Sequence, residues 1–294
     1  MRLPPIQIIR DAVRLALAED VALGDATTAA LFPDPVGARG TIVAHQPLII
    51  AGMAVAREVC TQIDPAIKII RAADDGSKAE NKAIVLVVEG EAGSLLMAER
   101  VLLNFLQRLS GVATLTARFC QATQGYPTRI LDTRKTTPGL RALEKWAVRL
   151  GGGVNHRHSL GDGILIKDNH LTLLHAQGSN VTDACRLARE RGPHGLRIIV
   201  EAHSLAHVRE ALTGEADVIL LDNMTPAQVR QAVAVIKGRA LVEVSGGITL
   251  DIAGEMAAAG ADYLSIGALT HSAPAANLSM DIVATRQSRK AGRR

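Results

Sequence analysis

Cationic side chains gather where short apolar stretches end in the second half of the sequence. "RILDTRK" ends in Arg134 and Lys135, "GGGVNHR" contains His156 and Arg157, and "GILIKD" carries Lys167. Guanidinium groups can donate two hydrogen bonds at once to a carboxylate or a phosphate. Together these cations predict a binding site for an anion. The simpler alternative is that each one pairs with a neighbouring acid or faces water.

Carboxylates follow at the ends of the next apolar stretches. Glu201 lies in "RIIVEA" and Asp222 in "VILLDN". Carboxylates that face phosphates commonly hold Mg²⁺, which prefers oxygen ligands and keeps several waters. The two acids therefore predict a magnesium site, although they could also only balance the cations. The His–Arg–His run at 156–158 lacks the spacing of a helical metal motif, so we do not expect zinc there.

Glycines and small polar residues mark two further loops, in "VSGGIT" and "SIGALTHS". Backbone without side chains can approach a phosphate closely, and a following helix offers free N–H groups. Glycines also simply make turns, so either motif alone is weak evidence. The two in succession predict a phosphate site formed by Ser245, Gly246, Gly247, Gly267 and His271.

The elements that would position these residues alternate in type from about residue 128 onward. Nearly continuous apolar strands are separated by helical patterns at 139–150, 179–191, 204–213, 225–237 and 249–259. This alternation indicates a parallel α/β fold, either a barrel or an open doubly wound sheet. Six strands are clear, and "VNHRHS" is a candidate seventh. The polar residues fall at the carboxyl ends of the strands, where barrel enzymes carry their chemistry. No GxGxxG follows the first strand, which disfavours dinucleotide binding.

The first part of the chain has a different texture. A helix is expected at 6–19, a small sheet over 39–90 with a helix at 52–62, and a strong amphipathic helix at 94–109. Arg100 lies on the polar face of the last helix, where a solvated role and a binding role are equally plausible.

Composition limits the classes of function. Of the 294 residues, 48% are hydrophobic and 21% charged, and there is no apolar run of the ~20 residues that a bilayer requires. The N-terminal segment is predicted to be an amphipathic helix, not a signal peptide. Cys60, Cys120 and Cys185 form no CxxC pair, which predicts a reduced, cytoplasmic protein without disulfides. The net charge of +4 includes a basic end, but only 2% of residues are aromatic, which disfavours nucleic-acid binding.

The motifs together closely resemble the quinolinate phosphoribosyltransferase family. The resemblance runs from about Leu23 to Ser272, is most specific over 129–171, and includes "AERVLLNFLQRLSGVAT" upstream. It implies an N-terminal α/β open sandwich (1–115) and an incomplete seven-stranded α/β barrel (116–274). A segment at about 275–288 would pack back on the sandwich, and a basic tail would follow at 289–294. The implied reaction joins quinolinate to phosphoribosyl pyrophosphate with Mg²⁺, giving nicotinate mononucleotide, CO2 and pyrophosphate.

The resemblance also assigns roles to residues. Arg134, His156, Arg157 and Lys167 would hold the quinolinate carboxylates, and Arg100 would reach the same pocket from the partner in a homodimer. Lys135 would bind on the pyrophosphate side, with Lys135 and Lys167 catalytic. Glu201 and Asp222 would lie near ribose and magnesium. The 5′-phosphate would be cradled by Ser245, Gly246, Gly247, Gly267 and His271.

Some positions depart from the family pattern. His203 stands where an additional acid is common, His45-Gln46 replaces a frequent Arg-Glu pair, and "DGSKAENK" lacks a usual glycine. Related phosphoribosyltransferases of molybdenum-transport gene clusters share the "DTRKT" stretch but diverge around "NHR" and "KDNH", which are intact here. Two other classes stay open: a Schiff-base lyase using Lys167, which borohydride would trap, and a non-catalytic phosphate-ligand sensor, which turnover would exclude.

The stretch "ILDTRKTTPGLR" joins a strand to a helix. Thr137 and Pro138 suit the N-cap and first position of that helix, with Leu140, Leu143, Ala147 and Leu150 on its inner face. Asp132 is expected only to orient the neighbouring cations.

Overall fold

The computed structural model describes residues 3–285, which fall into two compact units. The first unit comprises the described residues of Met1–Leu115, Thr137–Gly151 and Ala273–Arg294, and the second comprises Thr116–Thr136 and Gly152–Ser272. The tail expected at 289–294 lies outside the described residues. No helix within 3–285 combines the length and the apolar character that crossing a membrane demands.

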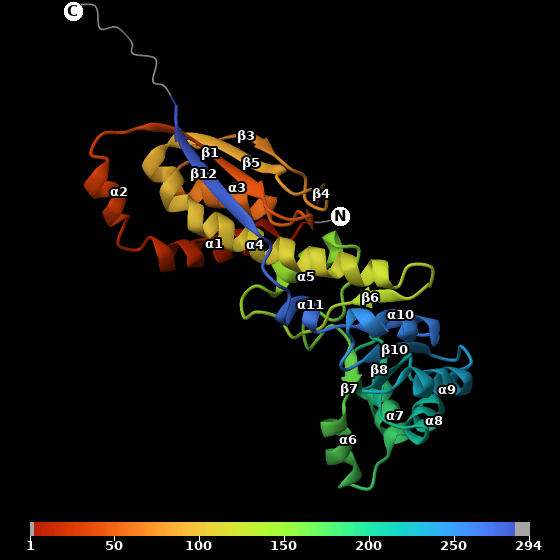
Figure 1. Ribbon diagram of the computed structural model, residues 1–294. Coiled ribbons are helices and arrows are strands. Elements are labelled where there is room, and N and C mark those ends of the chain that lie inside the picture. Colours follow the sequence, from red (N-terminus) through yellow and green to blue (C-terminus); the bar gives the residue numbers. More distant parts are fainter. Residues whose placement is uncertain (1–2, 286–294) are drawn as a thin grey trace, which may run out of the picture. The chain divides into compact units, whose positions relative to one another are not determined.

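An antiparallel sheet forms the centre of the first unit (Figure 1). Its strands are β12 (Leu278–Ala284), β1 (Gly37–Ala44), β5 (Ile84–Glu91) and β3 (Lys68–Ala72), in that order. The late strand β12 pairs with β1 from Ala44↔Leu278 to Ala38↔Ala284. Gly40 leaves room there for the end of the Met280 side chain, since a Cβ atom would lie 2.0 Å from Met280 Cε. A small ladder joins β2 (Leu48–Ile49) to β4 (Lys78–Ala79).

Helices accompany this sheet: α1 (Ile6–Asp20), α2 (Ala26–Leu31), α3 (Met53–Ile63), α4 (Ala92–Ala122) and α5 (Arg141–Leu150). In α1 the buried residues are Ile9, Val13 and Leu17, one per turn, as an amphipathic helix requires. The prediction for α4 ended at 109, but the helix continues because Val112, Ala113 and Phe119 extend its buried face. It contributes residues up to 115 to the first unit and the remainder to the second.

The start of α5 differs from its prediction. The N-cap position is Leu140, without a side-chain cap, so Thr137 and Pro138 lie before the helix. Thr137 instead donates its backbone N–H to Glu144 Oε2 at 3.0 Å and its hydroxyl to Glu144 Oε1 at 2.6 Å. Leu143 and Ala147 are buried as expected, whereas Leu140 and Leu150 are only half-buried.

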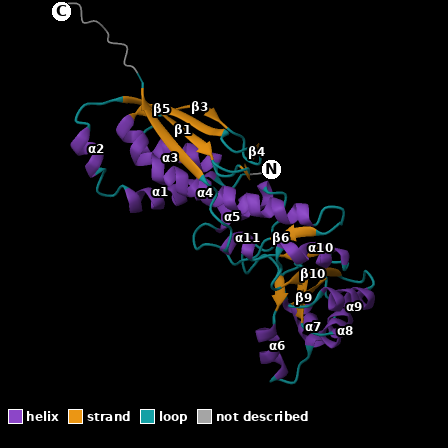
Figure 2. Ribbon diagram, viewed as in Figure 1, coloured by secondary structure: helices purple, strands orange, loops and turns teal. Residues whose placement is uncertain are grey.

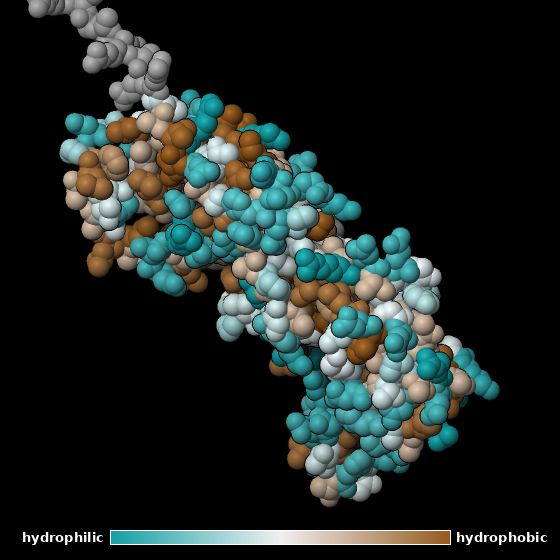
Figure 3. Space-filling model, viewed as in Figure 1, coloured by the Kyte–Doolittle hydropathy of each residue, from teal (hydrophilic) through white to brown (hydrophobic). Residues whose placement is uncertain are grey.

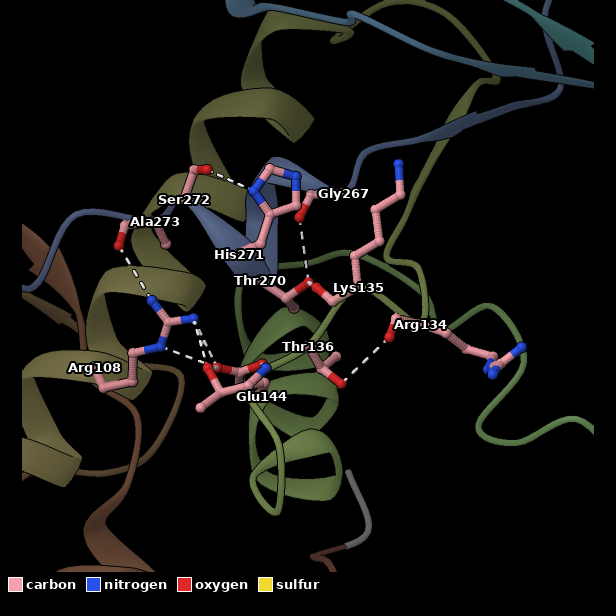
Figure 4. A network of polar contacts seen from close by, with 11 residues as sticks. Arg108, Arg134, Lys135, Thr136, Glu144, Gly267, Thr270, His271, Ser272 and Ala273 are labelled. Atoms are coloured by element: carbon pink, nitrogen blue, oxygen red, sulfur yellow. Dashed lines mark hydrogen bonds and ion pairs between the residues drawn. The ribbon is translucent and has the colours of Figure 1, made fainter.

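Glu144 is also the partner of Arg108 in α4 (Figure 4). Arg108 donates from Nε at 3.0 Å and from Nη2 at 2.7 Å to Glu144 Oε1, and from Nη1 to the Ala273 carbonyl at 3.3 Å. The Glu144 side chain is fully buried. The Arg108–Glu144 pair therefore joins α4 and α5 to two further segments of the first unit, which begin at Thr137 and Ala273.

The second unit contains a parallel sheet in the order β6-β11-β10-β9-β8-β7. The strands are β6 (Arg129–Leu131), β7 (Ile164–Ile166), β8 (Ile198–Ala202), β9 (Val218–Asp222), β10 (Leu241–Ser245) and β11 (Tyr263–Ser265). The candidate seventh strand is reduced to one parallel bridge, Leu131↔Val154, at the free edge of β6. Ile199, Val218 and Leu220 form a buried cluster with Leu165 and Leu241 packed against it.

Helices α7 (Val181–Arg191), α8 (Leu205–Thr213), α9 (Pro226–Ile236) and α10 (Leu250–Ala258) alternate with these strands, and α8 packs against α7 and α9 (Figure 2). Two short helices, α6 (Asp168–His175) and α11 (Ala268–His271), follow β7 and β11. The sequence prediction missed α6 because it is polar and buries only Leu171.

The cysteines Cys60, Cys120 and Cys185 are free thiols. Burial raises the pKa of the Cys60 and Cys185 thiols to about 11. These thiols are therefore poor nucleophiles near neutral pH, since the thiolate is the reactive form.

Candidate active site

A polar cavity of about 220 Å³ opens at the carboxyl ends of the parallel strands in the second unit. Strands β8, β9 and β10 are buried along most of their length, and Glu201, Asp222 and Ser245 are half-buried at or near their last positions. The cavity is lined by Thr133, Arg134, Lys135, His156, Arg157, Leu165, Lys167, Glu201, Leu220, Asp222, Glu243, Ser245 and Ser265.

The loop after β6 carries Arg134 and Lys135. The Lys135 backbone N–H donates to Thr133 Oγ1 at 3.0 Å, and its carbonyl accepts from Thr270 Oγ1 at 2.7 Å (Figure 4). The second contact fixes the loop after β6 to α11. Gly267, at the start of α11, lets both side chains approach closely, since a Cβ atom would lie 3.1 Å from both Lys135 Cδ and the His271 ring.

Asp132 has a definite structural role. Its side chain is fully buried and accepts from Asn155 Nδ2 at 2.6 Å and from the His156 backbone N–H at 2.8 Å. These two contacts tie the end of β6 to the "NHR" segment, and the orienting role of Asp132 toward Arg134 and Lys135 stays a prediction.

Arg157 is held in the cavity with part of its hydrogen-bonding capacity unused. Its Nη1 donates to the Gly163 carbonyl at 3.0 Å, whereas its Nε is buried without a hydrogen-bond partner among the described residues. Burial lowers the pKa of this guanidinium, and the nearby charge of Arg134 lowers it further. An arriving anion would relieve that repulsion and supply an acceptor.

Glu243 is a site residue that the sequence prediction missed. It is 2% exposed within β10, accepts a hydrogen bond from Ser265 Oγ, and lies 3.3 Å from His156 Nε2. His156 Nδ1 accepts from the Arg157 backbone N–H at 2.7 Å, so Nε2 carries the ring hydrogen and points at Glu243. An acid inside an apolar strand, "LVEVS", was the available signal.

Glu201 and Asp222 form the acidic side of the cavity. Burial raises the pKa of Glu201, and the Asp222 carboxylate raises it further. Asn223 Nδ2 donates to Asp222 Oδ2 at 2.6 Å. Glu201, Asp222 and His203 each offer a ligand atom, and these atoms all lie within 4.8 Å of one another. Two carboxylates and an imidazole are suitable ligands for a divalent cation.

The loop after β10 contains Gly246 and Gly247, the two glycines of the predicted phosphate site. Gly246 has φ +90°, and a Cβ atom there would lie 2.2 Å from Asn223 Oδ1. Asn223 in turn donates its backbone N–H to the Ser245 carbonyl at 2.9 Å. Gly247 has φ +61° and faces open space. His271, beyond β11, is exposed and its Nδ1 lies 2.5 Å from Ser272 Oγ.

The family resemblance implies that this loop binds phosphoribosyl pyrophosphate, and on that expectation Gly246→Ala should weaken use of this substrate more than Gly247→Ala. Both substitutions place alanine at positive φ, at a cost of about 1–2 kcal/mol each. Only the first also collides with Asn223 and displaces the loop beside Asp222. Steady-state KM for this substrate, compared between the two variants, measures the difference. Equal KM values in both would contradict a role for the close Gly246–Asn223 contact.

Arg100 belongs to a different unit from the other predicted residues. It lies in the first unit, is exposed on α4, and does not line the cavity. The cavity brings together Arg134, Lys135, His156, Arg157, Lys167, Glu201, Asp222 and Ser245. Gly246 and Gly247 directly follow Ser245, and Gly267 and His271 lie beside Lys135.

The fold and the site define an α/β protein with a cavity at the carboxyl ends of its parallel strands, and the cationic side chains that line this cavity suit an anion. Family models for quinolinate phosphoribosyl transferase match residues 25–110, as the N-terminal domain, and 112–281, as the C-terminal domain. The chain belongs to the quinolinate phosphoribosyltransferase family.

Proteins of similar sequence and structure match this chain over nearly its whole length. A nicotinate-nucleotide pyrophosphorylase [carboxylating] of Mycobacterium leprae is 42% identical, covering 93% of this chain and 96% of its own. A probable enzyme of the same name from Bacillus subtilis is 40% identical, with 92% of each chain covered. The solved nicotinate-nucleotide pyrophosphorylase of Francisella tularensis superposes with a TM-score of 0.90 at 35% identity, covering 95% of this chain and 98% of that one.

Proposed function

We propose that this chain transfers the phosphoribosyl group of phosphoribosyl pyrophosphate to quinolinate, yielding nicotinate mononucleotide, CO2 and pyrophosphate in NAD biosynthesis. The observation that carries the proposal is one cavity in which Arg134, Arg157 and Lys167 face Glu201 and Asp222. Such a cavity suits a dianionic pyridine next to a ribose whose anomeric carbon gains positive charge in the transition state, and the family name gives quinolinate and phosphoribosyl transfer.

The cationic side binds quinolinate. Arg134 and Arg157 donate to its two carboxylates, with the buried Arg157 Nε as one donor, while Lys167 contributes charge from the end of β7. Glu243 lies 3.3 Å from His156 Nε2 and fixes the orientation of that ring at the wall of the cavity. Orientation accounts for much of the catalysis, because two anions must be brought together in one geometry.

The opposite side binds phosphoribosyl pyrophosphate. Lys135 lies next to the Gly267–His271 turn and interacts with pyrophosphate, and the 5′-phosphate is cradled by Ser245, Gly246, Gly247, Gly267 and His271. The close packing at Gly246 and Gly267, where a Cβ atom would collide, is consistent with loops shaped for backbone contact with a phosphate.

Glu201 and Asp222 would hold a divalent cation, which the family resemblance implies is Mg²⁺, and their mutual repulsion fits that charge. When bound, the cation neutralises charge that develops on the departing pyrophosphate. The pyridine nitrogen forms the bond to the anomeric carbon as the bond to pyrophosphate breaks. The 2-carboxylate then leaves as CO2, its bonding electrons stay at C2 beside the pyridinium nitrogen, and C2 takes up a proton.

A homodimer completes the site in this proposal. Arg100 is exposed on α4 of the first unit, and exposed apolar side chains accompany it on that unit: Leu15, Leu23, Leu31 and Phe32 (Figure 3). Apolar side chains gathered around α2 support an interface with a second copy. We place the protein in the cytoplasm, which suits its free thiols.

Mixing two inactive variants tests the shared site. Arg100→Ala and Lys167→Ala each damage every site of their own dimers, but a mixed dimer contains one site with both residues intact. Random mixing should therefore restore about one quarter of wild-type activity. If the refolded mixture stays as inactive as its components, Arg100 does not act across a dimer.

The direct test is incubation with quinolinate, phosphoribosyl pyrophosphate and Mg²⁺. Release of CO2 from quinolinate labelled in its 2-carboxylate, in equal amounts with nicotinate mononucleotide, is the expected result. Nicotinate in place of quinolinate is the control substrate, because it lacks the carboxylate that leaves. Absence of both products from folded protein would overturn the proposal.

A further inference from the structure

We infer that His203 is a third ligand of the Glu201–Asp222 cation site and shifts its preference from Mg²⁺ toward Mn²⁺ and Co²⁺. The inference rests on the proposed function, in which that site holds a divalent cation. It adds a residue outside the pair assigned to the metal and changes the chemical class of the preferred ion.

The segment after β8 brings His203 close to Glu201. β8 ends at Ala202, and Ser204 caps α8 by accepting from the His207 backbone N–H at 3.2 Å. His203 lies in the bend between β8 and α8, and from there its ring reaches the Glu201 carboxylate. His203 Nε2 lies 3.6 Å from Glu201 Oε1, and the Asp222 ligand atom lies within 4.8 Å of both.

The charges around Glu201 favour a cation at this position. Glu201 and Asp222 are both half-buried at the carboxyl ends of the paired strands β8 and β9, and their carboxylates lie close enough to share one ion. The Asn223 contact to Asp222 Oδ2, at 2.6 Å, holds that carboxylate in place. Such outer contacts orient a ligand before the metal arrives.

The donor set determines which ion suits the site. Mg²⁺ is a hard ion that prefers oxygen ligands and near-ideal octahedral geometry. An imidazole nitrogen suits later divalent transition ions better, and affinity for a mixed nitrogen and oxygen site rises from Mn²⁺ to Co²⁺. His203 therefore gives this site a preference that two carboxylates alone would not have.

The competing explanation is that a protonated His203 only neutralises Glu201. The two explanations predict opposite effects on metal binding. As a ligand, His203 strengthens binding of Co²⁺, so its removal weakens it. As a fixed positive charge, His203 opposes any cation, so its removal strengthens binding of all of them.

The experiment measures dissociation constants of Mg²⁺, Mn²⁺ and Co²⁺ by calorimetry on the full chain without substrates, at the pH of the activity assay. The variants are His203→Ala and His203→Asp. His194→Ala is the matched control, since His194 is an exposed histidine that precedes β8 at its other end. Circular dichroism confirms that each variant is folded.

We expect His203→Ala to weaken Co²⁺ binding by about tenfold or more, a typical effect of disturbing a metal's surroundings. His203→Asp, with an all-oxygen donor set, should lower the preference for Co²⁺ over Mg²⁺ while retaining Mg²⁺ affinity. In the Co²⁺ form, the visible absorption should change in both variants and stay unchanged in His194→Ala. Unchanged metal preference in both His203 variants, or tighter binding of all three ions in His203→Ala, would overturn the inference.

The metal titration and the activity assay separate the two proposals. Metal binding that depends on His203 in a protein that does not convert quinolinate would leave the inference standing and refute the proposed function. If the protein converts quinolinate but its metal preference does not change in the His203 variants, the proposed function stands and the inference about His203 is refuted.

Discussion

Lys167→Ala should lower kcat/KM for quinolinate by about 10²- to 10³-fold, the range that follows loss of one well-placed charge-stabilising group. Lys167 follows the carboxyl end of β7 and lines the same cavity as the acids of β8 and β9 and the two arginines. Its removal leaves a quinolinate carboxylate without that charge and leaves Glu201 without a neighbouring ammonium group that lowers its pKa. Arg134→Ala should act in the same direction.

Which of the two substrates shows the change in KM is as informative as the size of the loss in kcat/KM. KM for phosphoribosyl pyrophosphate should change much less than that for quinolinate in both variants, because the glycine loops and Lys135 remain. Arg191→Ala is the control, since Arg191 is an exposed cation in the last turn of α7, away from the cavity lining. Wild-type kinetics in both Lys167→Ala and Arg134→Ala would refute the assignment of the quinolinate side.

Glu144→Ala should lower the free energy of unfolding by about 3–5 kcal/mol, the usual cost of breaking a buried ion pair by removing one partner. Glu144 is fully buried and accepts hydrogen bonds from Arg108 and from both the backbone and the hydroxyl of Thr137. Its loss leaves the largely buried Arg108 guanidinium without this carboxylate and frees the segment before α5 (Figure 4).

Urea unfolding at equilibrium measures this effect. The matched control is Glu190→Ala, which breaks the exposed pair with Arg186 in α7, where both side chains are more than half exposed. An exposed pair of this spacing is worth only about 0.3–0.5 kcal/mol. A similar loss in the two variants would show that burial does not make the Arg108–Glu144 pair important.

Sequence patterns predicted the type of most elements because period and polarity follow from local geometry. Continuous apolar runs gave the parallel strands, and helical spacing gave α1, α3 and α7 to α10. Boundaries depended on distant contacts. Helix α4 extends beyond its predicted end because its later turns are also buried. Helix α5 begins later than predicted because Thr137 forms hydrogen bonds to Glu144 instead of capping the helix.

The functional site also has a part that the sequence predicts and a part that depends on the tertiary structure. Arg134, Lys135, Lys167, Glu201 and Asp222 could be predicted because parallel strands bring their carboxyl ends to one edge, so polar strand endings gather there. Tertiary structure alone decided what Asp132, Glu144, Glu243 and His203 do. A lone acid or histidine in a sequence carries no information about its partner, since its role depends on which distant donor or carboxylate the folded chain places within a few ångströms.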